Sequence, residues 1–235
     1  MLNKLNIENI LFLDIETAPL WEGYQKMPEK FRHLWDHKAQ YLKTAGEQSP
    51  EDLYERAGIY AEFGRIICIS VGFVRGEELK IKSFYADSEK DLLNEFALLL
   101  HQHYNKDHHN LCAHNGKEFD FPYIARRMLV NGIEIPAILD TQARKPWEVK
   151  FLDTMEMWKF GDYKNFTSLE LLSAIFEIPT PKDDISGKDV AVVYWRDKDL
   201  ARIVKYCQKD VITIVQLFRK FQLCSLIPDS AIRII

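Results

Sequence analysis

Two carboxylates at the end of the first apolar segment constrain this chain more than any other feature. The segment Ile10 to Asp14 is apolar up to its acid and predicts a short buried strand. Side chains alternate along a strand, so Asp14 and Glu16 are expected on one face, with Cα atoms about 6.5–7 Å apart. Unpaired carboxylates this close repel by about 4 kcal/mol at an effective dielectric of about 20. A divalent cation would remove the repulsion, whereas two acids facing solvent are the simpler interpretation of this tripeptide alone.

A third acid precedes the predicted helix that begins near Pro122 and reaches Val130. Asn131-Gly132 ends this helix. Asp120 is therefore expected at the helix N-terminus, where exposed backbone amides favour a carboxylate. Taken alone, Asp120 is better explained by helix capping than by chemistry.

A fourth acid lies on a long amphipathic helix expected from about Leu200 to Leu223. At 100° per residue one stripe of this helix is apolar, comprising Leu200, Ile203, Val204, Cys207, Val211, Ile214, Val215 and Phe218. Asp210 falls about 20° outside the stripe, with Tyr206 one turn before it on the same margin. The opposite side carries Lys205, Lys209, Arg219 and Lys220. Asp210 is thus expected where the helix meets the core.

The remaining pattern predicts an α/β layer fold. Residues 65–74 form a strand, Gly76-Glu77 a tight turn, and residues 79–85 its hairpin partner. A helix capped by Ser88 extends to His103. Further expected elements are short strands at 111–113 and 149–152, a helix from a Thr167/Glu170 capping box to Phe176, a loop at 182–187, and a helix capped by Ser186.

We expect a single domain over residues 1–235, because no repeat or linker divides the chain. Residues 20–62 mix aromatic and charged side chains, and Ser49-Pro50-Glu51-Asp52 is typical of a helix start. We interpret this stretch as a helical insertion between two strands. It could be a packed lid without chemistry, or it could wall one side of the site.

Composition limits the cellular context. Four scattered cysteines without a C-x-x-C pair favour reduced core residues of a cytoplasmic protein. No apolar run approaches the ~20 residues that span a bilayer, and Met1 to Lys4 does not begin a signal peptide, so no membrane partner is expected. The net charge of −4 argues against tight non-specific nucleic-acid binding. An enzyme that holds nucleic acid locally stays possible, because carboxylate ligands themselves make a site acidic.

Three motifs occur in a fixed order: Asp14-Ile15-Glu16-Thr17, Asn115 to Asp120, and Tyr206 to Asp210. This set resembles the DEDD superfamily of 3′–5′ exonucleases, in the DEDDy subclass with tyrosine in the third motif. It is most similar to the proofreading exonuclease domain of family-B DNA polymerases, over nearly the full length. The remainder leaves no room for polymerase palm or fingers, so the resemblance implies a stand-alone exonuclease. The histidine subclass would require histidine where Lys205 stands.

The resemblance implies a ribonuclease H-like fold. Its mixed sheet has three antiparallel strands first and parallel strands after, with helices on both faces. It also implies two divalent cations, Mg²⁺ or Mn²⁺, for which carboxylates are suitable ligands. Asp14 would bridge both cations, Glu16 and Asp210 would complete the water-activating site, and Asp120 would hold the second cation. Tyr206, with an ordinary pKa near 10, is a poor base and would orient the attacking water.

Substrate contacts follow from the same motifs. Thr17, Asn115 and Phe119 would contact the terminal nucleotide, and Lys117 and Arg126 are further candidates for phosphate contact. For Arg126 and Arg127, ordinary charge on a helix surface is at least as good an interpretation.

The expected activity is metal-dependent cleavage from the 3′ end of single-stranded nucleic acid, with DNA as the expected substrate. An exoribonuclease on the same fold is the nearest alternative. A non-catalytic scaffold that binds nucleic acid or a partner protein is the alternative from another class, and the intact acids count against it.

Overall fold

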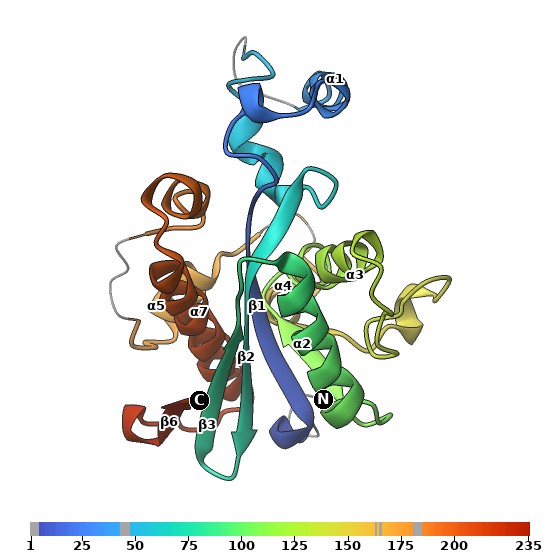
Figure 1. The fold of residues 1–235 in the computed structure, drawn as a ribbon. Helices are drawn as coiled ribbons and strands as arrows, with labels where there is room; N and C mark the ends of the chain where they lie inside the picture. Colours follow the sequence, from blue (N-terminus) through green and yellow to red (C-terminus); the bar gives the residue numbers. More distant parts are fainter. Residues whose placement is uncertain (1–4, 43–47, 163, 165, 181–184) are drawn as a thin grey trace.

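The computed structural model describes residues 5–42, 48–162, 164, 166–180 and 185–235. The paired segments form one mixed sheet in the order β5-β4-β1-β2-β3-β6 (Figure 1). Its strands are β1 (Ile10–Pro19), β2 (Gly64–Arg75), β3 (Glu78–Phe84), β4 (Asn110–Ala113), β5 (Leu152–Asp153) and β6 (Ile232–Ile234). β2 pairs antiparallel with both β1 and β3, whereas β4 pairs parallel with β1, β5 with β4, and β6 with β3. This arrangement confirms the predicted mixed sheet.

Helices cover both faces of the sheet. The helices of the described chain are α1 (Glu29–Ala39), α2 (Glu89–His103), α3 (Asp120–Val130), α4 (Thr154–Lys159), α5 (Leu169–Ile175), α6 (Val190–Val192), followed by a π-helical turn (Val193–Asp197), and α7 (Leu200–Phe221); of these, α1 lies beyond the end of the sheet. One hydrophobic cluster joins the sheet to α2 and α3, and another joins its opposite face to α7 (Figure 1). The sheet therefore lies between two helical layers.

Alternation along β1 decides which helix its acids face. Leu11, Leu13 and Ile15 pack in the cluster with α2 and α3, whereas Ile10 and Phe12 pack with α7. Because side chains two apart share a face, Asp14 and Glu16 belong to the α7 side of the sheet. The predicted strand ended at Asp14, which is wrong, since β1 continues to Pro19 by pairing with β2 as far as Gly64.

The long helix α7 forms as predicted and ends two residues earlier, at Phe221. Its apolar stripe is buried against the sheet. Arg219 was expected on the solvent side, which is wrong: it is 9% exposed and donates to the backbone carbonyl of Ser225. The chain turns back over this end of α7 on its way to β6, and this turn covers Arg219.

The stretch between β1 and β2 lies at the end of the sheet and has its own hydrophobic cluster around Trp35 (Figure 1). It contains α1 and a 3₁₀ helix (Tyr54–Ile59). Ser49 and Asp52 make the two reciprocal hydrogen bonds of a capping box. However, a turn and the 3₁₀ helix follow them where an α-helix was predicted. Residues 43–47 of this stretch lie outside the described ranges.

Some other predicted boundaries shift. The strand expected at 149–152 is only Leu152–Asp153. The helix expected to start at Thr167 is capped by Ser168, whose hydroxyl accepts the Leu171 N–H. The prediction that Ser186 caps the next helix is wrong: α6 begins after Asp189 without a side-chain cap, and Ser186 donates to the Asp189 carboxylate in the turn before it. The rest of the predicted loop, residues 182–184, lies outside the described residues.

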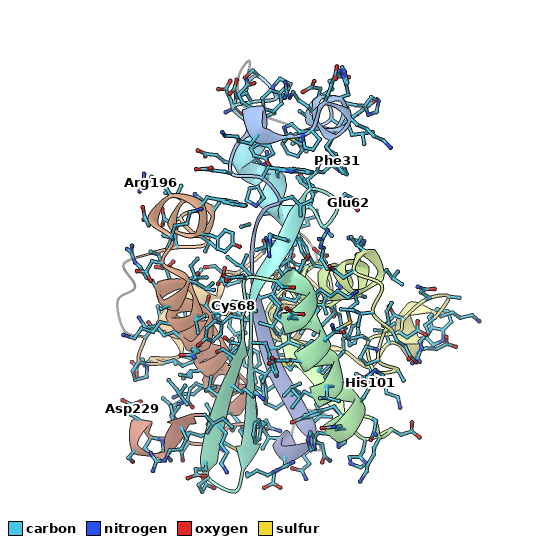
Figure 2. All side chains as sticks on the ribbon, viewed as in Figure 1. Phe31, Glu62, Cys68, His101, Arg196 and Asp229 are labelled. Carbon is cyan, nitrogen blue, oxygen red and sulfur yellow. The ribbon has the colours of Figure 1, made fainter. Side chains whose placement is uncertain are left out.

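The four cysteines are free in the structure. Cys68, Cys112 and Cys207 are buried, as predicted, and Cys224 is exposed. Cys68 lies on β2 near the middle of the molecule (Figure 2). Within the described ranges, no helix combines the length and the apolar character that crossing a membrane requires.

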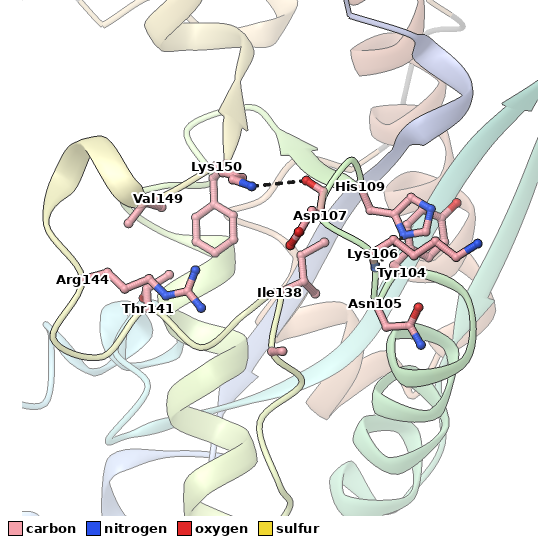
Figure 3. A pocket seen from close by; sticks show the side chains of 12 residues that line it. Tyr104, Asn105, Lys106, Asp107, His109, Ile138, Thr141, Arg144, Val149 and Lys150 are labelled. Atoms are coloured by element: carbon pink, nitrogen blue, oxygen red, sulfur yellow. Dashed lines mark hydrogen bonds between the residues drawn. The ribbon is translucent and has the colours of Figure 1, made fainter.

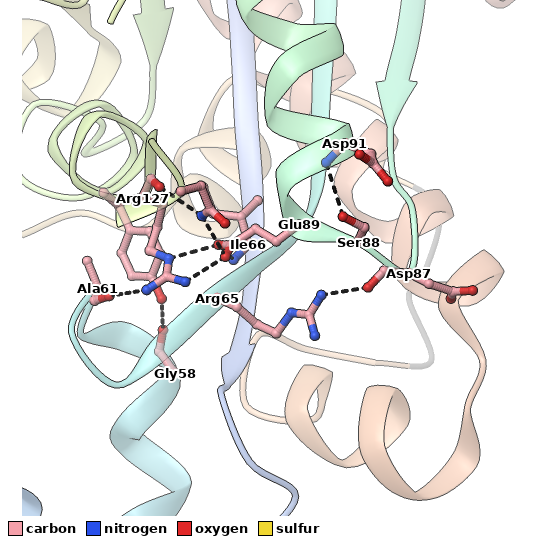
Figure 4. Close-up of polar contacts among 11 residues, drawn as sticks. Gly58, Ala61, Arg65, Ile66, Asp87, Ser88, Glu89, Asp91 and Arg127 are labelled. Atoms are coloured by element: carbon pink, nitrogen blue, oxygen red, sulfur yellow. Dashed lines mark hydrogen bonds and ion pairs between the residues drawn. The ribbon is translucent and has the colours of Figure 1, made fainter. Parts of the chain in front are cut away.

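A buried ion pair connects α2, α3 and the start of β2 (Figure 4). Arg127 donates from Nε and Nη2 to the Glu89 carboxylate, at 2.9 and 2.6 Å. The same carboxylate accepts the backbone N–H of Ile66 at 2.7 Å. Arg127 also donates to the carbonyl of Ala61, at the edge of the insertion. Arg127 is 4% exposed, so its interpretation as helix-surface charge is wrong.

Candidate functional site

Asp14 and Glu16 of β1 meet Cys207 of α7. One possible ligand atom from each of these three side chains lies within 4.8 Å of the others. The Cys207 thiol donates to the backbone carbonyl of Asp14 at 3.4 Å. This contact follows from the fold, because the even-numbered side chains of β1 and the apolar stripe of α7 face each other.

Asp120 joins the pair from the start of α3. Its Oδ1 accepts the backbone N–H of Ile15 at 3.2 Å, and its side chain is buried. The parallel partner β4 ends at Ala113, so β1 extends beyond it and its edge is open to another acceptor there. Asp120 therefore fixes α3 to β1 and also brings a carboxylate beside Asp14 and Glu16.

Electrostatic coupling ties Asp210 to the same cluster. Burial raises the pKa of Asp14 well above its usual range, and the charges of Glu16, Asp210 and Asp120 raise it further. Burial likewise raises the pKa of Glu16, with Asp210 as the strongest neighbouring charge. Burial raises the pKa of Asp120 to about 7, against the hydrogen bonds to its carboxylate, which lower it. Four acids from β1, α3 and α7 thus lie close enough to interact, with Glu16 and Asp120 buried and Asp14 and Asp210 half-buried.

This donor set fits a hard divalent cation. Buried carboxylates are unfavourable together unless a cation compensates their charge. Carboxylate oxygens are the ligands that Mg²⁺ and Mn²⁺ prefer. The nearby Cys207 does not change this preference, because burial raises the pKa of its thiol and keeps it protonated, and only a thiolate binds metal well.

Tyr206 lies one helical turn before Asp210 on α7. Its phenol hydrogen-bonds to the Asp210 carboxylate. Burial raises the pKa of Tyr206, and the charges of Asp210, Glu16 and Asp14 raise it further. The phenol is therefore neutral at physiological pH. It can hold a water by hydrogen bonding but cannot serve as a general base there.

The loop between β4 and α3 is shaped by its backbone. Asn115 adopts a positive φ of 62°. At Gly116 an added Cβ would come within 2.4 Å of the Ala113 side chain, so only glycine fits. Asp153, 2% exposed, accepts the backbone N–H groups of Asn115 and Lys117 at 3.0 and 3.1 Å. This loop is held in a fixed shape beside Asp120.

Asp153 is a residue that shapes the site and that the sequence reasoning did not single out. It also accepts the N–H groups of Met155 and Glu156, and so caps α4. The spacing Asp153-x-x-Glu156 is a capping signal that could have marked it. Its bonds to the loop, in contrast, carry no local signal. Its role is structural, because all four of its hydrogen bonds go to backbone amides.

The other residues predicted to contact the substrate differ in their surroundings. Thr17 follows a register shift in β1 and hydrogen-bonds to the Tyr123 phenol. The Phe119 ring packs against that of Tyr123, with centroids 5.4 Å apart. Lys117 forms an ion pair with Glu156, and Arg126 is exposed on α3. Thr17 and Phe119 thus share a neighbour, whereas Lys117 is engaged by a carboxylate.

Two grooves flank Tyr206. One, of about 600 Å³, lies between α5 and α7 and is lined by Tyr206, Lys209 and Asp210 on the α7 side. The other, of about 490 Å³, follows α7 toward its N-terminus. A separate pocket of about 140 Å³ is lined by residues such as His109 and Phe151, which precede β4 and β5 (Figure 3). That pocket is at the amino ends of these strands, away from the acids.

Comparisons with known proteins give the molecule its context. Residues 59–227 match the family model described as a predicted 3′–5′ exonuclease related to the exonuclease domain of PolB. Asp14 and Glu16 precede the matched residues. A DNA polymerase of Pyrococcus glycovorans is 24% identical over 191 residues, which are 73% of this chain and 24% of the polymerase.

A solved structure is also similar. The family B DNA polymerase of the hyperthermophilic archaeon Pyrobaculum calidifontis matches with a TM-score of 0.56 and 15% identity, over 91% of this chain and 24% of its own. The chain therefore spans about a quarter of the length of each of these polymerases. At this identity the likeness concerns the fold, and it confirms the ribonuclease H-like mixed sheet expected from the sequence.

Proposed function

Because the chain belongs to the family of predicted 3′–5′ exonucleases related to the exonuclease domain of PolB, we propose that it hydrolyses phosphodiester bonds at the 3′ end of single-stranded DNA. The convergence of the Asp14, Glu16, Asp120 and Asp210 carboxylates, two of them buried and two half-buried, is the observation that supports this activity most strongly. DNA as the substrate is supported by the two similar proteins, both of them DNA polymerases.

Two divalent cations, Mg²⁺ or Mn²⁺, would supply an acidified water and neutralise charge on the phosphate when bound. Asp14 would contact both, with Glu16 and Asp210 at one position and Asp120 at the other. The carboxylates support such a site, since they are buried or half-buried and close enough to raise one another's pKa.

The chain's own groups would position the reactants. The Tyr206 hydroxyl, beside Asp210, would hold the attacking water in line with the scissile bond. Thr17, Asn115 and Phe119 would contact the terminal nucleotide from the β1 and α3 side of the acids. The loop at Gly116, fixed by its close packing and by the Asn115 N–H to Asp153 hydrogen bond, would hold Asn115 and Phe119 in place for this task.

We predict that Tyr206→Phe lowers the single-turnover rate by about 10–100-fold while Mn²⁺ binding persists. The substitution removes one hydrogen bond that orients the water and retains the packing of the ring. Rapid-quench rates and calorimetric titration with Mn²⁺ measure the two effects. Tyr194→Phe is the matched control, because Tyr194 packs in the same hydrophobic cluster. An unchanged rate in Tyr206→Phe would mean that the tyrosine only packs.

We predict that cleavage starts at a free 3′ hydroxyl and is blocked by a 3′ phosphate. The measurement uses matched 5′-labelled DNA and RNA oligonucleotides with Mg²⁺, with Mn²⁺ and with EDTA. Successive shortening of DNA without products in EDTA is the expected result. Faster shortening of RNA would make the chain an exoribonuclease, and cutting of a circular single strand would indicate an endonuclease.

A further inference from the structure

A stripe of cations, Lys205 exposed and Arg202 and Lys209 half-buried, runs along α7 next to Tyr206. Arg202, Lys205 and Lys209 are spaced three and four residues apart, so they share one face of the helix. All three line the groove of about 490 Å³ that follows α7 toward its N-terminus. Tyr206 lines the same groove. The stripe therefore begins beside the proposed catalytic residues.

The local charge of this groove is opposite to that of the protein. The chain carries a formal charge of −4. Among the residues that line the groove, three are cationic and one, Asp199, is acidic. Asp199 caps α7 by accepting the Arg202 N–H. Arg202 also faces Asp189, because its charge lowers the pKa of that carboxyl. The balance favours an anionic ligand along α7.

The groove is continuous with the acids. Tyr206 and Lys209 line both this groove and the neighbouring one, and Asp210 lines the latter. From Arg202 to Lys209, α7 rises about 10 Å. That length matches about three phosphates at the stacked spacing of about 3.4 Å, and fewer in an extended strand. A polyanion with regularly spaced charges fits these dimensions.

We propose that the strand 5′ of the scissile phosphate lies in this groove, with its phosphates against Arg202, Lys205 and Lys209. The inference rests on the proposed exonuclease function and adds the path of the substrate to it. The terminal nucleotide, held by Thr17, Asn115 and Phe119, would occupy the other side of the acids. In this groove the protein would bind the phosphate backbone of the strand and not its bases. Binding there should therefore show no sequence preference.

The test removes two of the positively charged side chains and measures how binding of a single strand depends on salt concentration. Each phosphate contact to a single strand contributes a slope of about −0.7 to log K against log salt. In the variant R202A/K205A the slope of log K against log salt should therefore be less steep by about 1.4. At 0.1 M salt this variant should bind a twelve-nucleotide oligothymidylate at least about tenfold more weakly than the parent. Binding is measured in the Asp14→Asn background, so that the strand is not degraded. In K205A alone, which changes an exposed residue, the slope should be less steep by about 0.7.

The matched control K90A/K220A removes the same charge from α2 and from the far end of α7. It should leave the slope unchanged. Cleavage of a dinucleotide, which is too short to enter the groove, should be equal in R202A/K205A and the parent. A slope in R202A/K205A equal to that of the control overturns the inference. Loss of all cleavage in the parent overturns the proposed function instead, because the salt slope is read from binding.

Discussion

Replacing Asp14 by Asn is expected to reduce 3′-end hydrolysis by at least about 10³-fold. Asp14 is the acid whose pKa is raised by all three of its partners, Glu16, Asp210 and Asp120, in addition to burial. A side chain in this position would contact both cations. Bound cations stabilise the transition state by several kcal/mol. Since about 1.4 kcal/mol changes the rate tenfold, losing much of this stabilisation lowers the rate by at least about 10³-fold. Single-turnover cleavage of a 5′-labelled oligonucleotide measures the loss. Activity within tenfold of the parent would contradict the assignment.

The same substitution should stabilise the metal-free fold at neutral pH. A carboxyl whose folded pKa is raised binds its proton more tightly in the folded state. Its favourable contribution is present at low pH and is lost as pH rises through the folded pKa. For Asp120 this range runs from its ordinary 3.8 to about 7. Without metal, the parent protein should therefore melt at a lower temperature at pH 8 than at pH 5, and Asp14→Asn should reduce that difference.

Glu118→Gln is the matched control for Asp14→Asn. Glu118 is exposed and lies two residues before Asp120, so it tests the loss of an acid near the site without entering the buried cluster. Both activity and the pH dependence of melting should match those of the parent. A shift in Glu118→Gln as large as in Asp14→Asn would mean that general surface charge governs both properties.

Glu89→Ala is expected to lower the free energy of unfolding by about 3–5 kcal/mol, because it leaves a buried guanidinium without its counter-charge. Glu89 is 7% and Arg127 4% exposed, so water cannot replace the lost partner. The backbone N–H of Ile66 would lose its acceptor as well. Chemical denaturation at fixed pH measures the change. Glu78→Ala is the comparison, since its exposed ion pairs with Lys80 and Arg233 should contribute only about 0–1 kcal/mol.

A double variant separates charge from packing at this site. Glu89→Leu with Arg127→Met removes both charges and keeps much of the buried volume. It should recover a large part of the stability lost in Glu89→Ala. If the double variant is as unstable as Glu89→Ala, the loss comes from the hydrogen bonds that Glu89 accepts from Ile66 and Asn131 and not from an unpaired charge.

Features that depend on a few neighbouring residues were predictable from the sequence. The period of two along β1 put Asp14 and Glu16 on one face, and the period of 3.6 along α7 gave its buried stripe. Ser88 caps α2 as its spacing indicated. These patterns express local geometry, which every strand or helix shares. The candidate acids could be found in this way, and the Asp14 and Tyr206 variants test their roles.

Tertiary contacts decided the rest. β1 continues to Pro19 because β2 pairs with it, and β2 begins 45 residues later at Gly64. Arg127 is buried because Glu89, 38 residues away, meets it in the core. Asp153 fixes the Asn115 loop across a separation of 38 residues. No local pattern encodes such pairs, since the partner that satisfies a buried charge or an open strand edge is chosen only when distant segments pack together.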